Sequence, residues 1–373
     1  MSATGATLSG SYSAVTGTIV EAGFKYGLSS GSLSSSKTGT YNNGSISASL
    51  SGLTAGTTYY YQAYAKVQGT LDYSSEVKTF TGAVKSFRTT VPTWLSSYEI
   101  PSNNASAVTS SDTQYNGYYS HGTVDEHWGG TKIAYYNTSN ANHRIVVHTF
   151  AYNSKILSNY TLLYDKTKKC ALWVAYKHNG TDYKDEGVGR HDEWKYDPAL
   201  PADWQPNLSG AYAGNYDRGH QVASNDRQTT ADQNRQTFYF SNMTPQYSTL
   251  NQGQWSSVEG KIQGFATNTG SNQELYVVTG PLFSGAASYT QDSAGADCML
   301  PSGYYKCAVR LTYDNSGKIT DAKGCAYIVE TNSENRAATL TSIDAVESKT
   351  GFDFFANIPD QYEAIAESGT SSL

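Results

Sequence analysis

Hydrophobic and polar residues alternate in short runs along most of the chain, and a helical period appears in a few stretches. From residue 143 onward, apolar and aromatic side chains gather in runs typical of buried strands: HRIVVHTF, NYTLLYD, CALWVAYKH, ELYVVTGPLF, YKCAVRLTYD and CAYIVET. Three other stretches are helix-like: TADQNRQTFYF, LNQGQWSSVEGKIQGFA and SIDAVESKTG. The pattern predicts an α+β domain with a substantial sheet over residues 131–373.

Residues 1–91 carry strand patterns alone. TIVEAGFKYGL, GSISASLSGL, TTYYYQAYAKV and SEVKTF are separated by Gly, Ser and Asn clusters, which predicts a small all-β sandwich. Residues 50–65, LSGLTAGTTYYYQAYA, resemble the late-strand region of fibronectin type III domains, where a Leu and a Gly-Thr turn precede a Tyr-rich strand. Residues 92–130 are polar and aperiodic, as expected of a linker or entry segment. We therefore expect two domains, 1–91 and 131–373.

Composition limits the classes of partner. The 373 residues carry a formal net charge of −6. Residues 1–91 hold six basic and three acidic side chains, a net +3, which leaves −9 on the remainder. A polyanionic ligand would need a local basic groove on that acidic body. No apolar stretch is long enough to span a membrane.

The expected location is outside the cytoplasm. A Tyr-, Ser-, Thr- and Asn-rich surface favours a secreted, periplasmic or cell-surface protein, although Met1 is followed by a polar stretch and we expect any export signal to be missing from this sequence. Four cysteines without Cys-x-x-Cys spacing argue against structural zinc and for two disulfides, with three possible connectivities. A Pro-Ser-Gly turn between Cys298 and Cys307, and strand-like runs starting at Cys170 and Cys325, favour the pairs Cys298–Cys307 and Cys170–Cys325.

The stretch NYDRGHQVASNDRQ sets the cation Arg218 beside the titratable base His220. A base next to a permanent cation suits phosphodiester hydrolysis, but a histidine after a glycine is also common in ordinary turns. Downstream, FSNMTPQYSTLNQGQWSSVE contributes Asn242, Asn251 and Glu259. Asn251 opens an amphipathic run and lies eight residues before Glu259, so on a helix the two face broadly the same way. Plain alternatives are an N-cap for Asn251, a solvated helix position for Glu259 and a turn for Asn242.

Taken together, DRGH, NMTPQ and LNQGQW followed by VE resemble the DNA/RNA non-specific endonucleases, the ββα-metal or His-Me finger nucleases that include endonuclease G. The resemblance extends to GRHDEWKYDPAL, YVVTGPLF and PSGYYKCAV and covers most of residues 130–360. It implies a ββα-metal domain with a central antiparallel sheet. It implies that His220 is the general base and that Arg218 and Arg190 contact phosphate. It also implies that Asn251 is a direct metal ligand and that Glu259 holds water bound to the ion. Asn242 would orient the site.

The family's chemistry is compatible with these residue types. Neutral imidazole is a competent base near pH 7, and a guanidinium can bind phosphate oxygens in a bidentate way. Mg²⁺, with Mn²⁺ as an alternative, prefers oxygen ligands and keeps most of its waters, so few carboxylates are needed. The resemblance thus implies a hydrolase that cuts DNA and RNA without sequence preference and leaves 5′-phosphate ends.

Two alternatives belong to other functional classes. The β-sandwich, the aromatic surplus and the acidic charge also fit an inactive surface adhesion or carbohydrate-binding protein, with a surface or carbohydrate partner for the N-terminal domain. A phosphodiesterase acting on small or lipid phosphodiesters is the other alternative. An open, positively lined groove would favour polymeric nucleic acid, and a closed apolar pocket would favour small substrates.

Overall fold

A computed structural model gives the structure of this protein, and it describes residues 5–13, 17–53, 58–68, 77–88, 98, 100–101, 120–125, 132–138, 140–153, 155–178, 183 and 185–373. The chain divides into two compact units, residues 1–95 with 118–120 and residues 96–117 with 121–373. Most of the predicted linker, residues 92–130, lies outside the described residues.

The N-terminal unit is all-β, as its alternating pattern predicts. Its described strands form one sheet in the order β1-β5-β4 and a second in the order β3-β2-β6-β7, with β8 also paired to β6. In β5, Ile46, Ala48 and Leu50 point into the core and the serines between them face solvent, which is the period-two pattern of a half-buried strand. The bounds are β1 (Gly5–Ser11), β2 (Thr18–Gly27), β3 (Ser35–Thr38), β4 (Thr40–Asn42), β5 (Ser45–Ser51), β6 (Thr58–Gln68), β7 (Val77–Thr81) and β8 (Lys85–Arg88). The likeness to fibronectin type III domains stays a prediction.

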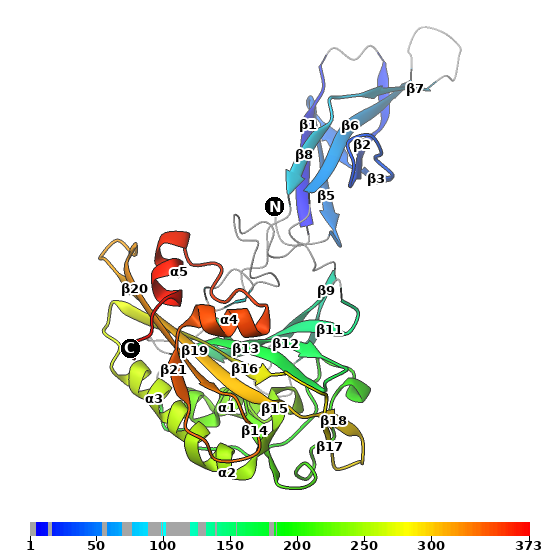
Figure 1. The fold of residues 1–373 in the computed structure, drawn as a ribbon. Coiled ribbons are helices and arrows are strands. Elements are labelled where there is room, and N and C mark those ends of the chain that lie inside the picture. Colours follow the sequence, from blue (N-terminus) through cyan, green and yellow to red (C-terminus); the bar gives the residue numbers. More distant parts are fainter. Residues whose placement is uncertain are drawn as a thin grey trace. The chain divides into compact units, whose positions relative to one another are not determined.

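The C-terminal unit is built on one large antiparallel sheet. Its described strands follow the order β21-β20-β19-β16-β13-β12-β11-β10-β9 (Figure 1). The bounds are β9 (Ser120–Asp125), β10 (Lys132–Asn137), β11 (His143–Tyr152), β12 (Lys155–Asp165), β13 (Cys170–Lys177), β16 (Gln273–Leu282), β19 (Gly303–Tyr313), β20 (Ile319–Val329) and β21 (Thr339–Thr341). β13, β16 and β19 are buried over nearly their whole length because both faces of the sheet are covered.

Different layers cover the two faces of the sheet (Figure 1). On one face lie α1 (Ala231–Gln236), the paired strands β14 (Tyr216–His220) and β15 (Met243–Tyr247), and a continuous helical segment made of α2 (Ser248–Leu250), the π-helical turn η5 (Asn251–Trp255) and α3 (Ser256–Thr267). Val258, Ile262 and Phe265 of α3 pack into the core, as the helical period predicts. On the other face lie α4 (Ile343–Thr350) and α5 (Asp360–Glu367). β14, β15 and α3 form the ββα unit, which confirms the predicted α+β class.

The predicted disulfides are wrong, because all four cysteines are free and buried. Cys170 in β13 and Cys325 in β20 are separated by β16 and β19, so roughly 14 Å lies between their strands, beyond the ~7 Å Cα limit of a disulfide. Cys298 belongs to β18 (Asp297–Met299), which pairs with β17 (Tyr289–Gln291) outside the large sheet. Cys307 lies in β19 and faces Glu347 of α4. Burial raises the pKa of all four thiols, which keeps them protonated and unreactive.

Among the described residues, no helix combines the length and the apolar character that crossing a membrane requires.

Candidate active site

The DRGH motif lies on β14 and is paired in register with β15. Arg218 is opposite Pro245, Gly219 opposite Thr244 and His220 opposite Met243. A Cβ added at Gly219 would lie 2.5 Å from Cβ of Gln246, so only glycine fits between the two functional side chains. The strand therefore presents Arg218 and His220 two residues apart, on the same face.

Replacing Gly219 by alanine is expected to destabilise the fold by about 1–3 kcal/mol, the usual cost of overpacking a tight site, and to lower activity because β14 must shift. Gly260 in α3 is the matched control. A Cβ at Gly260 has nothing within 4 Å, so Gly260→Ala should leave stability unchanged or raise it by up to about 1 kcal/mol. Chemical unfolding of both variants checks this. Equal stabilities for the two variants would show that the close approach of Gln246 does not exclude a side chain at position 219.

Two aromatic rings enclose His220. Trp194 lies edge-on with its ring centroid 5.5 Å away, and Phe238 lies edge-on at 5.0 Å. Nε2 of His220 is buried and has no hydrogen-bond partner in the described structure. Burial, followed by the positive charges of Arg190 and Arg218, lowers the pKa of His220 to about 3. The imidazole is therefore neutral at pH 7 and can accept a proton.

Two guanidinium groups stack on the same aromatic rings. Arg218 lies 3.7 Å from the centroid of Trp194 and donates to the carbonyl of Leu208 at 3.1 Å. Arg190 lies 4.8 Å from the centroid of Phe238, half-exposed, and its Nε donates to Asp192 at 3.0 Å. Stacking orients both cations without using all of their donors, so donors stay available for an anionic ligand.

Asp217 fixes the start of the helical segment against β14. Its carboxylate accepts hydrogen bonds from Nδ2 of Asn251 and Nε2 of Gln252, both at 2.9 Å, and from Oγ of Ser248 at 2.8 Å. Burial opposes the ionised form of Asp217, but these bonds outweigh it and lower its pKa. Asn251 is not an N-cap, since it continues the helical segment in the π-turn η5. Because its nitrogen is held by Asp217, its amide oxygen is the group it can offer to the pocket.

Asn242 acts on the backbone that follows His220. Its side-chain Oδ1 accepts a hydrogen bond from the amide of Val222 at 3.0 Å, and its Nδ2 donates to the carbonyls of Val222 at 3.0 Å and Thr237 at 2.9 Å. The backbone carbonyl of Asn242 accepts from the amide of Gln221 at 3.0 Å. The side chain is fully buried. It can therefore position His220 through residues 221 and 222, and it does not reach the pocket itself.

Glu259, which is half-buried, belongs to a polar group with the buried residues Lys306 and Asp226, and sequence reasoning missed those two. Burial raises the pKa of Glu259 to about 7, while Lys306 opposes the rise and Asp226 adds to it. Lys306 is fully buried and its Nζ donates to the carbonyl of Gln221 at 3.3 Å. Burial alone would raise the pKa of Asp226, but His178 and Lys306 outweigh it and hold that pKa well below its usual range. Lys306 falls within PSGYYKCAV, one of the stretches that resemble the endonuclease family. A lysine inside a strand-like run does not by itself indicate a site residue, so Lys306 was not predicted.

One cavity of about 390 Å³ brings together five of the six predicted site residues. Its walls include Arg190, Arg218, His220, Asn251 and Glu259. Asn242 is the exception and lies behind the wall. A second cavity of about 890 Å³ shares Arg190 and Asn225 with the first, so the two adjoin.

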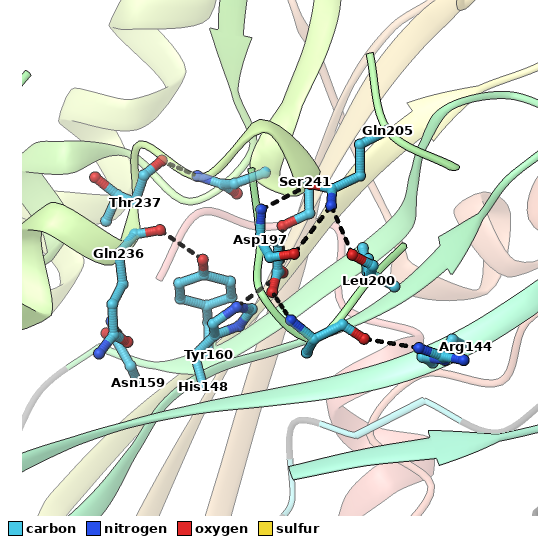
Figure 2. A network of polar contacts seen from close by, with 12 residues as sticks. Arg144, His148, Asn159, Tyr160, Asp197, Leu200, Gln205, Gln236, Thr237 and Ser241 are labelled. Carbon is cyan, nitrogen blue, oxygen red and sulfur yellow. Dashed lines mark hydrogen bonds and ion pairs between the residues drawn. The ribbon is translucent and has the colours of Figure 1, made fainter. Parts of the chain in front are cut away.

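The segment that carries Arg190 and Trp194 is anchored by a buried polar network (Figure 2). Asp197 accepts from Nε2 of His148 at 2.9 Å, from Oγ of Ser241 at 2.6 Å and from the amide of Ala199 at 2.9 Å. His148 and Asp197 are both fully buried, and the His148 ring stacks on Tyr160 with centroids 4.3 Å apart. The network ties the segment to β11 and so fixes the aromatic walls around His220.

Comparison with known proteins places this architecture in a family. The sequence model described as DNA/RNA non-specific endonuclease matches residues 139–361. A nuclease of Nostoc sp. is 30% identical over 57% of this chain and 77% of its own length, and a nuclease of Serratia marcescens is 32% identical over 56% of this chain and 77% of its own. A chain in a crystal structure of an EndoG/EndoGI complex is 20% identical, with a TM-score of 0.44, over 58% of this chain and 88% of that one.

The chain belongs to the DNA/RNA non-specific endonuclease family. It is thus a hydrolase of nucleic acids, and its family depends on divalent metal ions.

Proposed function

We propose that the protein is a sugar-non-specific endonuclease in which His220 is the general base, Arg218 and Arg190 bind phosphate, and Asn251 and Glu259 hold one Mg²⁺ ion, with Mn²⁺ as a substitute. Asn242 is a positioning residue in this proposal. The observation that carries it is the single cavity lined by a neutral histidine, two stacked guanidinium groups and an oriented amide oxygen.

In the proposed reaction a water molecule attacks phosphorus and gives its proton to His220. The bond between phosphorus and the 3′ oxygen breaks, and that oxygen takes up a proton from solvent water, leaving a 5′-phosphate and a 3′-hydroxyl. The low pKa of His220 keeps the base unprotonated before each turnover, but it also lowers the proton affinity of the ring, since a general base is strongest in action when it titrates near the working pH. The side chain is held between Trp194 and Phe238, so its orientation is set before substrate binds.

The two arginines supply fixed positive charge where negative charge grows on the phosphoryl oxygens. Arg218 is the better placed of the two, since Leu208 and Trp194 fix it beside His220. Arg190 is paired with Asp192, so a phosphate must compete with that carboxylate.

The residues present fit the family's divalent ion. Asn251 can offer an amide oxygen, Glu259 a carboxylate, and both line the same cavity. Hard oxygen ligands suit Mg²⁺ and Mn²⁺. When bound, such an ion polarises a phosphoryl oxygen and stabilises the charge on the leaving oxygen.

The shape of the site favours a polymer over a small phosphodiester. The two adjoining cavities extend past one phosphodiester group and are lined mainly by polar side chains. The test is a panel of duplex DNA, single-stranded DNA and RNA of mixed sequence, incubated with Mg²⁺. We expect cleavage of all three with 5′-phosphate ends. Activity on bis(p-nitrophenyl) phosphate without cleavage of any polymer would refute this proposal in favour of a small-molecule phosphodiesterase.

Substitution of Arg218 by alanine is expected to weaken binding equally across sequences, because a phosphate contact carries no base information. The slope of log affinity against log salt on duplex DNA should flatten by about one unit. Arg336→Ala is the control, since Arg336 is an exposed arginine paired with Glu334 away from the cavity. The measurement is the affinity of each variant for duplex DNA at several salt concentrations, with chelator present to suppress cleavage. Sequence-dependent losses, or an unchanged slope, would mark Arg218 as structural.

Location and the N-terminal partner remain predictions. Action outside the cytoplasm rests on surface composition alone, since the four thiols are free. A surface or carbohydrate ligand for the N-terminal unit is proposed on its all-β architecture. The inactive-adhesin alternative is disfavoured because five of the six residues to which the family resemblance gives a role line one pocket.

A further inference from the structure

Five carboxyl groups gather on the face of the sheet that carries α4 and α5, away from the catalytic cavity. Asp344 and Glu347 lie one turn apart on α4, and Glu363 and Glu367 one turn apart on α5. Asp353 lies in the connection between the helices. Oxygen atoms of Asp344, Glu347 and Glu367 lie within 4.8 Å of one another, and so do those of Asp353, Glu363 and Glu367. Glu367 therefore belongs to both sets.

The burial of this cluster is what separates it from an ordinary acidic surface. Asp353 is only 6% exposed and Glu363 only 7%. Oδ2 of Asp353 and Oε1 of Glu363 are buried and have no hydrogen-bond partner in the described structure. A buried carboxylate oxygen without a partner costs free energy, because it has lost water and gained nothing in exchange. Oε1 of Glu367 is a third such atom, and three of them in one cluster point to a positively charged ligand.

No basic side chain of the described chain supplies that charge. The nearest lysine on α4, Lys349, instead pairs with Glu330 at 2.7 Å. Burial and mutual repulsion among the carboxyl groups raise the pKa of Glu347 to about 7 and that of Glu363 to about 8. Burial raises the pKa of Asp353 to about 6. Oε1 of Glu347 accepts a hydrogen bond from the amide of Phe354 at 2.6 Å, and this bond and one with the Glu367 side chain only partly offset the rise in its pKa.

The local structure holds these groups in place. Ser342 caps α4 by accepting from the amide of Ala345 at 3.2 Å, and Gly351 ends α4 with a φ of 73°, which turns the chain so that Asp353 comes back beside the helix. α5 packs closely on β20, since a Cβ at Gly324 would lie 2.3 Å from the carbonyl of Ala366. The carboxyl groups thus come from three segments that a shared ligand would join.

We propose that Asp353, Glu363 and Glu367, with Glu347 and Asp344 beside them, bind a calcium ion that ties α4 to α5. An all-oxygen set with several protein carboxylates suits Ca²⁺, which takes six to eight oxygen ligands in flexible geometry. Mg²⁺ suits it less well, because it keeps several waters and is usually held by one or two carboxylates. The role is structural, since the ion would neutralise buried charge and join the C-terminal helices to the sheet.

The experiment uses the full chain carrying Asn251→Ala, so that the catalytic ion contributes little. Calcium titration followed by calorimetry should show binding, and calcium at about a hundred times its dissociation constant should raise the melting temperature by roughly 5 °C. Adding Asp353→Asn and Glu363→Gln should abolish the calcium response and raise the melting temperature without calcium, because repulsion between buried charges is relieved. Damage to the fold would instead lower it. Asp321→Asn, an exposed carboxyl on β20, should change neither result.

Three results would overturn the proposal. These are no calcium binding in the Asn251→Ala protein, calcium binding that survives the double substitution, and an equal rise in melting temperature with the same concentration of Mg²⁺. If the double variant does not fold, Glu367→Gln replaces it. Glu367 is shared by both carboxyl sets, so its substitution must weaken calcium binding at least tenfold.

Discussion

His220→Ala will lower the rate of nucleic acid cleavage by about a hundredfold or more, because general-base catalysis typically contributes that much. The loss will appear in the maximal rate rather than in substrate affinity, since the guanidinium groups of Arg218 and Arg190 remain in place. Single-turnover cleavage of duplex DNA at saturating Mg²⁺ measures it directly.

The matched control for this prediction is His191→Ala. His191 lies in the segment that carries Arg190 but does not line the catalytic cavity, so its substitution should leave the rate near that of the wild type. Circular dichroism and melting temperature should show that both variants are folded. A rate for His220→Ala close to that of the wild type would remove His220 from the reaction.

Asn251→Ala will raise the Mg²⁺ concentration needed for half-maximal activity by more than tenfold, because even residues that only orient metal ligands commonly cost 10- to 100-fold in metal affinity. Removing the amide also removes one of the hydrogen bonds that hold Asp217. Titration of activity with Mg²⁺, after treatment with chelator, gives the shift.

Gln252→Ala separates metal ligation from the hydrogen bond to Asp217. Gln252 donates to the same carboxylate oxygen at the same 2.9 Å, yet it has no proposed contact with the ion. We expect the Mg²⁺ concentration that gives half-maximal activity of Gln252→Ala to stay near that of the wild type. Equal shifts for the two variants would mean that Asn251 acts by supporting Asp217 and not as a ligand.

The sequence predicted the fold where the hydrophobic period was strong. The apolar runs of β11, β13, β16, β19 and β20 and the period of α3 predicted the sheet and the helix beneath it. It missed β14, because YDRGH is polar and its pairing with β15 depends on contact between segments far apart in the chain. The helix α5 was also missed, since its buried face includes the carboxyl of Glu363. The cysteine pairs failed for the same reason as β14, because strand order cannot be read from local pattern.

The candidate site shows a similar division. His220, Arg218, Asn251 and Glu259 were predicted from the resemblance of their motifs to the endonuclease family, and the structure brings them together in one cavity. Trp194 and Phe238, which enclose His220, were not singled out, because an aromatic side chain gives the same sequence signal in a core as beside a catalytic group. Lys306 and Asp226 act through burial and mutual charge, which become visible only when the sheet is assembled.

Metal-dependent cleavage of nucleic acid in the cavity that His220 and Asn251 line is the central proposal for this protein. The decisive measurement is nicking of supercoiled plasmid, with a parallel RNA substrate, by the purified wild-type protein after chelation and after return of Mg²⁺. We predict that chelator abolishes cleavage of both nucleic acids, that Mg²⁺ restores it, and that His220→Ala at the same concentration leaves both substrates largely intact. Cleavage that persists in chelator, or that is as fast in His220→Ala as in the wild type, would contradict the account.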